Sequence, residues 1–197
     1  MSESESSSVN LSQFKEKICL SGRLSLDAYA YRMDGSEGNN IENMAKYADL
    51  GTPSCCDYLY VKDQTAILIE DTFLEQKMKE LKLELGDFNK IERKKEFDRA
   101  KNLLKKEFCL KVYGALLILC RLMQKHIDIS RELNGKRFSF WFVINDQGNI
   151  PAIDNMELVS FFEQEFKRAL GGTLESAKLV TETRVLFSNQ LKKELQI

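Results

Sequence analysis

The sequence predicts an α/β protein in which a small mixed β-sheet is flanked by helices. Two apolar segments, residues 56–61 and 66–73, have the alternation and the β-branched or aromatic content of strands, and the polar residues 62–65 join them as a hairpin. A third segment, residues 137–145, has apolar side chains on both faces, which is typical of a central strand. The clearest helical periodicity of the chain lies between the hairpin and this strand.

The composition favours one helix-rich domain. The chain has 197 residues, of which 43% are hydrophobic and 30% charged, with only two prolines. Its net charge of −1 does not by itself indicate a nucleic-acid partner. Residues 1–10 are acidic and serine-rich and lack the apolar segment of a targeting signal, so we expect a disordered tail followed by a single domain over residues 11–197.

The cysteine and histidine content excludes several kinds of site. The five cysteines lack the spacing of a metal site, and their odd number favours reduced thiols in a cytoplasmic protein. His126 is the only histidine, which excludes histidine-rich metal sites. We expect His126 to end a helix, where a positive charge is favourable.

The N-terminal region is the least clear in its periodicity. A first helix is expected over residues 11–19, where Phe14 and Ile18 are four positions apart. Residues 22–31 alternate like a strand but also fit a helical turn, and the two interpretations stay open. Residues 34–40 have the composition of a loop.

A short helix is predicted over residues 41–50, immediately before the hairpin. Asn39 or Asn40 would cap its start, and Gly51 and Pro53 would stop it.

The helical pattern between the strands extends over residues 74–126, with a break expected near residues 85–88. Its later half, residues 112–123, is apolar nearly all round but shorter than the ~20 residues that cross a bilayer. We therefore expect a helix buried on several sides. Gly114 inside it indicates the close approach of another backbone.

The C-terminal region should add mainly helices. Residues 155–170 are predicted to be helical and to end at Gly171 and Gly172. Residues 178–187 fit either a strand or part of a helix, and the sequence does not decide between them. Residues 188–195 fit a short amphipathic helix.

Three carboxylates in the hairpin are the strongest functional lead. Asp57 lies in the first strand, and Glu70 and Asp71 interrupt the second. A carboxylate in an apolar strand is costly unless it binds a cation or is otherwise satisfied. The alternative is that Asp57 begins an exposed strand edge, and that Glu70 and Asp71 end one at solvent.

Over residues 41–145, the order of helix, two acidic strands, long helix and apolar strand resembles the core of the PD-(D/E)XK, or restriction-endonuclease-like, superfamily. In that family an Asp on one strand is followed by Glu-X-Lys on the next, and here Glu70 follows Asp57 in the same strand context. The resemblance implies a restriction-endonuclease-like core with additional helices, to which residues 146–197 add a helical extension.

The resemblance also implies a metal-dependent nuclease that acts on DNA, of the kind found in bacterial defence or mobile elements. Asp57, Glu70 and the backbone carbonyl of Asp71 would bind Mg²⁺ or Mn²⁺, with Glu42 as an auxiliary acid on the preceding helix. The metal would generate hydroxide and stabilise the phosphate in the transition state.

One position departs from the family pattern, because Thr72 occupies the place of the lysine. In some members this lysine reaches the site from a neighbouring element, and Lys77, Lys106 and Lys111 are the candidates here, with Lys77 taken as the catalytic one. Without such a lysine, the chain would be a catalytically inactive protein of the same fold that serves as a protein-binding or regulatory subunit.

The charge of the long helical region indicates which partners are possible. Residues 77–111 carry twelve basic and seven acidic side chains, which fits either a DNA-binding surface or a solvated helix with internal ion pairs. The expected partners are DNA, or a protein that is either a different chain or a second copy, and no membrane is expected. If the two strands are misassigned, the third hypothesis is a purely helical interaction protein that is unrelated to nucleases.

Overall fold

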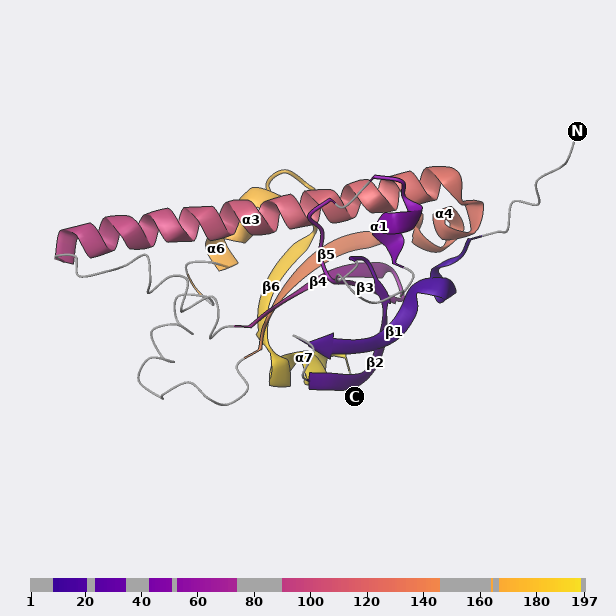
Figure 1. Ribbon diagram of the computed structural model, residues 1–197, viewed down its shortest axis with the longest axis horizontal. Helices are drawn as coiled ribbons and strands as arrows, with labels where there is room; N and C mark the ends of the chain where they lie inside the picture. The colour runs from indigo at the N-terminus through magenta and orange to yellow at the C-terminus, as the bar shows by residue number, and fades with distance from the viewer. Residues whose placement is uncertain are drawn as a thin grey trace, which may run out of the picture.

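Among the residues that the computed structural model describes, six strands form one sheet, in the order in which they occur along the chain (Figure 1). Neighbours from β1 to β4 are antiparallel, whereas β5 is parallel to β4 and β6 is parallel to β5. The fold is therefore α/β with a mixed sheet. The strands are β1 (Lys15–Leu20), β2 (Leu24–Arg32), β3 (Tyr58–Lys62), β4 (Thr65–Phe73), β5 (Arg137–Asn145) and β6 (Glu182–Phe187).

Helices cover both faces of this sheet. The longest, α3, lies between β4 and β5 in the chain, where two parallel strands need a crossover connection. The structure describes residues 9–20, 24–34, 43–50, 53–73, 90–145, 164 and 167–195. The helices in these ranges are the 3₁₀ turn η1 (Leu11–Phe14), α1 (Met44–Tyr47), α3 (Lys90–Lys125), α4 (Ile127–Leu133), α6 (Lys167–Leu174) and α7 (Ser188–Glu194).

The core is divided into two layers by the sheet. The larger layer lies under α3, where Phe108 packs against Phe142 of β5 with ring centroids 4.5 Å apart, and η1, α1, α4 and α6 contribute to the same layer. The smaller layer lies on the opposite face, where Leu191 of α7 packs with Trp141 and Val143 of β5. Residues two apart on β4 and β5 therefore face the same layer. No helix in the described ranges combines the length and apolar character needed to cross a bilayer.

The strands and the long helix predicted from the sequence are confirmed. The hairpin consists of β3 and β4, and its turn is formed by Asp63 and Gln64. Strand β5 and helices α3 and α7 lie where they were expected. The two undecided segments, residues 22–31 and 178–187, are strands over most of β2 and all of β6, respectively.

The helix expected over residues 11–19 is wrong. The 3₁₀ turn ends at Phe14, and β1 begins at Lys15. Ile18 and Leu20 are buried in alternation, and β1 pairs along β2. This pairing outweighs the four-residue spacing of Phe14 and Ile18, because tertiary contacts override local helix preference.

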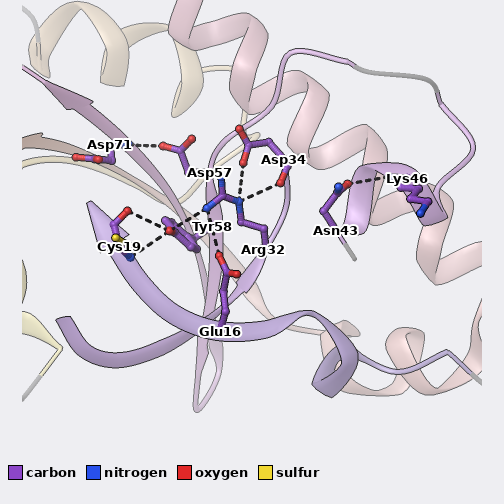
Figure 2. Close-up of polar contacts among 9 residues, drawn as sticks. All are labelled: Glu16, Cys19, Arg32, Asp34, Asn43, Lys46, Asp57, Tyr58 and Asp71. Atoms are coloured by element: carbon purple, nitrogen blue, oxygen red, sulfur yellow. Dashed lines mark hydrogen bonds and ion pairs between the residues drawn. The ribbon is translucent and has the colours of Figure 1, made fainter. Parts of the chain in front are cut away.

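The helix expected over residues 41–50 is shorter than predicted. It is described as Met44–Tyr47 and is capped by Asn43, whose side chain accepts a hydrogen bond from the Lys46 amide at 3.0 Å (Figure 2). The expected caps, Asn39 and Asn40, lie outside the described residues.

The end predicted for the helix before Gly171 and Gly172 is also wrong. Both glycines lie inside α6, where Leu170 and Leu174 are buried one turn apart and extend the helix past them. Most of residues 155–170 lie outside the described ranges. The C-terminal extension is not purely helical, because β6 forms an edge of the sheet.

Residues 112–123 are helical, but they are not buried on every side. Tyr113, Leu117 and Cys120 are exposed. The close approach predicted at Gly114 is confirmed, because the backbone oxygen of Ser54 lies where a Cβ atom would be. The expected helix break near residues 85–88 lies outside the described residues.

Candidate functional site

The hairpin brings Asp57 and Glu70 to the same end of the sheet. The β3–β4 register pairs Tyr58 with Ile69, so Asp57 and Glu70 occupy the next position outward on the two strands. Both lie on the face that α3 covers, because residues two positions inward on each strand pack under that helix. The Asp71 amide donates a 2.7 Å hydrogen bond to Asp57 Oδ2 and ties the two strand ends together.

Glu70 is buried and meets a lysine from the crossover helix. Its side chain is only 2% exposed, and Oε1 accepts a hydrogen bond from the ammonium group of Lys111 on α3. Its second oxygen, Oε2, is buried without a hydrogen-bond partner among the residues that the structure describes. Thr72, in the lysine position of the family pattern, is buried and supplies no charge.

The structure therefore brings together three of the residues singled out in the hairpin and one of the three candidate lysines. Lys111 is that lysine, whereas Lys106 is exposed on α3. Lys77, the lysine predicted to be catalytic, lies outside the described residues, and so does Glu42.

An acidic residue that the sequence analysis treated as part of a loop also lies at this site. Asp34 follows the end of β2, and the Met33 amide donates to the Asp57 carbonyl at 3.0 Å, which extends the β2–β3 pairing. Figure 2 shows Asp34 and Asp57 at these neighbouring strand ends. The alternation of residues 24–30 was the available signal, because a strand there ends beside Asp57.

Arg32 balances the charge of Asp34. Its Nε atom lies 2.9 Å from Asp34 Oδ1, and its Nη1 atom lies 3.2 Å from Glu16 Oε1. The same Nη1 donates to the Tyr58 hydroxyl at 3.1 Å, and that hydroxyl bonds to the backbone of Cys19 (Figure 2). Arg32 is thus occupied by Glu16, Asp34 and Tyr58, which leaves Lys111 as the nearby cation for Asp57 and Glu70 among the described residues.

The charges of the site disfavour two ionised carboxylates. Burial and then the nearby Asp34 raise the pKa of Asp57 to about 7, although the Asp71 amide and Lys111 act to lower it. Burial and then Asp57 raise the pKa of Glu70 well above its usual range, against Lys111. Burial alone would lower the pKa of Lys111, but Glu70 and Asp57 outweigh it, so this lysine remains charged.

The two cysteines beside Asp57 are not nucleophiles. Burial raises the pKa of Cys55 to about 12 and that of Cys56 well above the usual range, and the neighbouring carboxylates act in the same direction. Neither thiol forms a thiolate near neutral pH, and the thiolate is the reactive form.

The remaining chemistry is that of oxygen ligands with one fixed ammonium group. Lys111 contacts Glu70 and its charge also acts on Asp57, and the buried Glu70 Oε2 has no hydrogen-bond partner among the described residues. A divalent cation would offset the burial and the carboxylate repulsion that raise both carboxyl pKa values, and carboxylate oxygens suit Mg²⁺ and Mn²⁺. Within the described ranges, no group of three or more His, Cys, Asp or Glu side chains is arranged to hold a metal ion. Water, backbone or substrate oxygens would therefore complete the shell, as is usual for Mg²⁺.

The geometry of Asp57, Glu70 and Lys111 is the basis for a functional interpretation. Comparison with protein-family models, with curated proteins and with solved structures finds no match for this chain.

Proposed function

We propose that the protein is a metal-dependent nuclease that acts on DNA. Asp57 and Glu70 would hold Mg²⁺ or Mn²⁺, with the Asp71 carbonyl as a further ligand, and Lys111 would supply the positive charge. The observation that carries this proposal is the contact between Lys111 and Glu70. It provides a cation at the paired carboxylates even though Thr72 replaces the lysine of the strand motif.

The order of elements supports the proposed relation to the PD-(D/E)XK superfamily. Acidic residues lie at the ends of antiparallel β3 and β4, and the crossover helix α3 leads to the parallel strand β5. Asp34 is close enough to raise the pKa of Asp57, and we assign it the role of auxiliary acid.

Each residue has a distinct task in this mechanism. When bound, Mg²⁺ would lower the pKa of a coordinated water and offset the charge of the phosphate. Asp57, whose pKa is about 7, would give up its proton when it binds the cation. Lys111 holds a positive charge against Glu70 and offsets the charge of a phosphate that enters the site. Lys95 and Arg99 are exposed on α3 and provide positive charge for the flanking nucleic-acid backbone.

Calorimetric titration tests the metal site. MgCl₂ and MnCl₂ would be titrated into the wild type and into the Asp57→Asn and Glu70→Gln variants, with Asp27→Asn as a control at an exposed carboxylate. Saturable binding is expected for the wild type and the control, with affinity at least about 10-fold to 100-fold weaker in the site variants. Equal binding by all four proteins would refute the site.

Cleavage of DNA tests the reaction. Supercoiled, linear and single-stranded DNA, with RNA for comparison, would be incubated with each protein and with Mg²⁺ or Mn²⁺. Lys111→Met should lower the cleavage rate by about 100-fold or more while metal binding is retained, because the ammonium group that offsets the charge of the phosphate is lost and both carboxylate ligands remain. Metal binding without cleavage of any of these nucleic acids would exclude a nuclease.

Thr72 favours a second candidate, a catalytically inactive protein of the same fold that acts as a protein-binding or regulatory subunit. It is buried at the third position of the strand motif and offers only a hydroxyl group. In that case Lys111 serves only to neutralise Glu70. Wild type and Glu70→Gln/Lys111→Met would then be equally unable to bind metal, and they would have similar stability.

A further inference from the structure

Helix α3 carries a regular row of exposed side chains on the face that points away from the sheet. Leu103, Leu110 and Leu117 recur every seven residues and are 53%, 52% and 54% exposed. Tyr113 is 45% exposed and Cys120 is also exposed, and each follows one of these leucines by three positions. Figure 1 shows α3 lying along the outside of the molecule, with the sheet on its other side.

Four further observations indicate that this row is a continuous surface rather than a set of scattered exposed apolar residues. The spacing alternates between three and four over the whole row, which is the heptad pattern of helices that pair with another helix. All members of the row are exposed, and it extends over about 32 Å of helix at 1.5 Å per residue. The opposite face of the same segment is buried in the core. We name this row the α3 seam; it comprises Leu103, Lys106, Leu110, Tyr113, Leu117, Cys120 and Gln124.

We propose that the α3 seam binds the α3 seam of a second copy of this chain, in an antiparallel two-fold dimer. In antiparallel helix pairing, the two kinds of heptad position face each other. The register with Leu110 against Cys120 of the second copy and Tyr113 against its Leu117 pairs six of the seven seam residues. The long side chains of Lys106 and Gln124 meet at the two ends of this paired stretch, and Leu103 lies beyond it.

The charges beside the seam favour a second copy of this chain as the partner and an antiparallel arrangement of the two helices. Glu107 and Arg121 follow Lys106 and Cys120 directly, so both flank the seam on the same side. The register that aligns the seam also places Glu107 of one copy near Arg121 of the other, and the two-fold axis repeats the pair. In a parallel arrangement, each of these two residues would instead lie level with the same residue of the second copy, so that like charges would be closest. The surface is therefore complementary to itself in the antiparallel direction.

Sedimentation equilibrium tests the dimer. The wild type is expected to form dimers that dissociate on dilution, and Leu110→Glu/Leu117→Glu should raise the dissociation constant by at least about 100-fold. Lys95→Glu is the control, because it changes an exposed charge on the same helix outside the seam. Circular dichroism would verify that the variants fold. A wild type that stays monomeric at high concentration, or a double variant that dimerises equally well, would overturn the proposal.

Disulfide crosslinking tests the direction and register. Under mild oxidation, a Leu110→Cys variant should form a covalent dimer through a bond to the native Cys120 of the second copy, as the two thiols lose their hydrogens to the added oxidant. These positions are about 15 Å apart within one helix, which is too far for an internal disulfide. Asn102→Cys is the control, because this register places no native cysteine of the second copy beside it. Efficient linkage of the wild type through its two Cys120 thiols would indicate a parallel pair and overturn the register.

The charge pair provides an independent test of the same register. Glu107→Arg and Arg121→Glu should each weaken dimerisation by about 3-fold to 10-fold, and the double variant should recover it. Additive weakening in the double variant would show that these two residues do not meet across the interface.

Discussion

A Cβ atom on Gly114 would lie 1.9 Å from the backbone oxygen of Ser54. Ser54 immediately precedes the segment that leads into Asp57, and Gly114 lies one helical turn after Lys111. The backbone of α3 and the chain before β3 are therefore in direct contact beside the site. This contact sets the distance between the lysine on the helix and the carboxylates on the sheet.

Gly114→Ala should separate these elements. The methyl group would collide with backbone rather than with a flexible side chain, so we expect a loss of about 2–3 kcal/mol in the free energy of unfolding. Urea denaturation would measure it. The control is Gly172→Ala in α6, where a Cβ atom meets nothing within 4 Å and alanine should stabilise the helix by up to ~1 kcal/mol. Similar effects of the two substitutions would contradict the role of the close contact.

Lys111→Met should leave Glu70 buried without its cation. We expect a loss of about 3 kcal/mol at pH 8, because breaking a buried ion pair leaves an uncompensated charge. The variant should regain stability as the pH falls and Glu70 binds a proton. Adding Glu70→Gln should restore stability at pH 8 as well, whereas Lys125→Met, which removes a more exposed ion pair with Asp49, should cost less than about 1 kcal/mol. Urea denaturation at pH 6 and pH 8 would measure all four proteins.

Asp57→Asn should stabilise the metal-free protein at high pH. The pKa of Asp57 is about 7 in the folded chain against 3.8 for an ordinary aspartate, so the folded state binds more protons between these values. Stability conferred by the neutral carboxyl is complete below about pH 4 and is lost as the pH rises through 7. The advantage of the variant should therefore grow by roughly 2–4 kcal/mol from pH 4 to pH 8. A difference that does not change with pH would show that Asp57 has an ordinary pKa.

Metal affinity should depend on the proton of Asp57. Because a bound cation displaces that proton, the association constant for Mn²⁺ should rise about tenfold per pH unit from pH 5 to pH 7 and level off above. Calorimetry in buffers of different ionisation enthalpy would count the protons released. In the Asp57→Asn variant, any residual binding should lack this released proton. Affinity of the wild type that stays constant over this range would argue against Asp57 as a ligand.

The acidic half of the site was predictable because it is local. A short turn joins β3 and β4, so the strand pattern alone places Asp57 beside Glu70. Lys111 could not be distinguished from Lys77 and Lys106, because its contact with Glu70 depends on how α3 packs across the sheet. Asp34 was missed for a similar reason, since its position depends on β2, whose alternation also fitted a helical turn.

The exposure of the α3 seam could not be predicted because of the composition of this segment, and not because its contacts are distant in the sequence. Residues 112–123 are apolar nearly all round, which predicted a helix buried on several sides. The pattern does not reveal how many neighbours a helix has. Only the packed structure shows that the sheet covers one face and leaves Tyr113 and Leu117 exposed.

The pairing of Glu70 with Lys111 also makes the site a reporter of complete folding. The two residues are 41 positions apart, and the hairpin can form from local contacts before the crossover helix has docked. A chain arrested at that stage has its carboxylates next to each other but no ammonium group beside them. At that stage Glu70 is exposed to water, and burial under α3 then raises its pKa, so proton uptake by Glu70 during refolding would time the docking of the helix. The proposed metal site would then be complete only after this last step of folding.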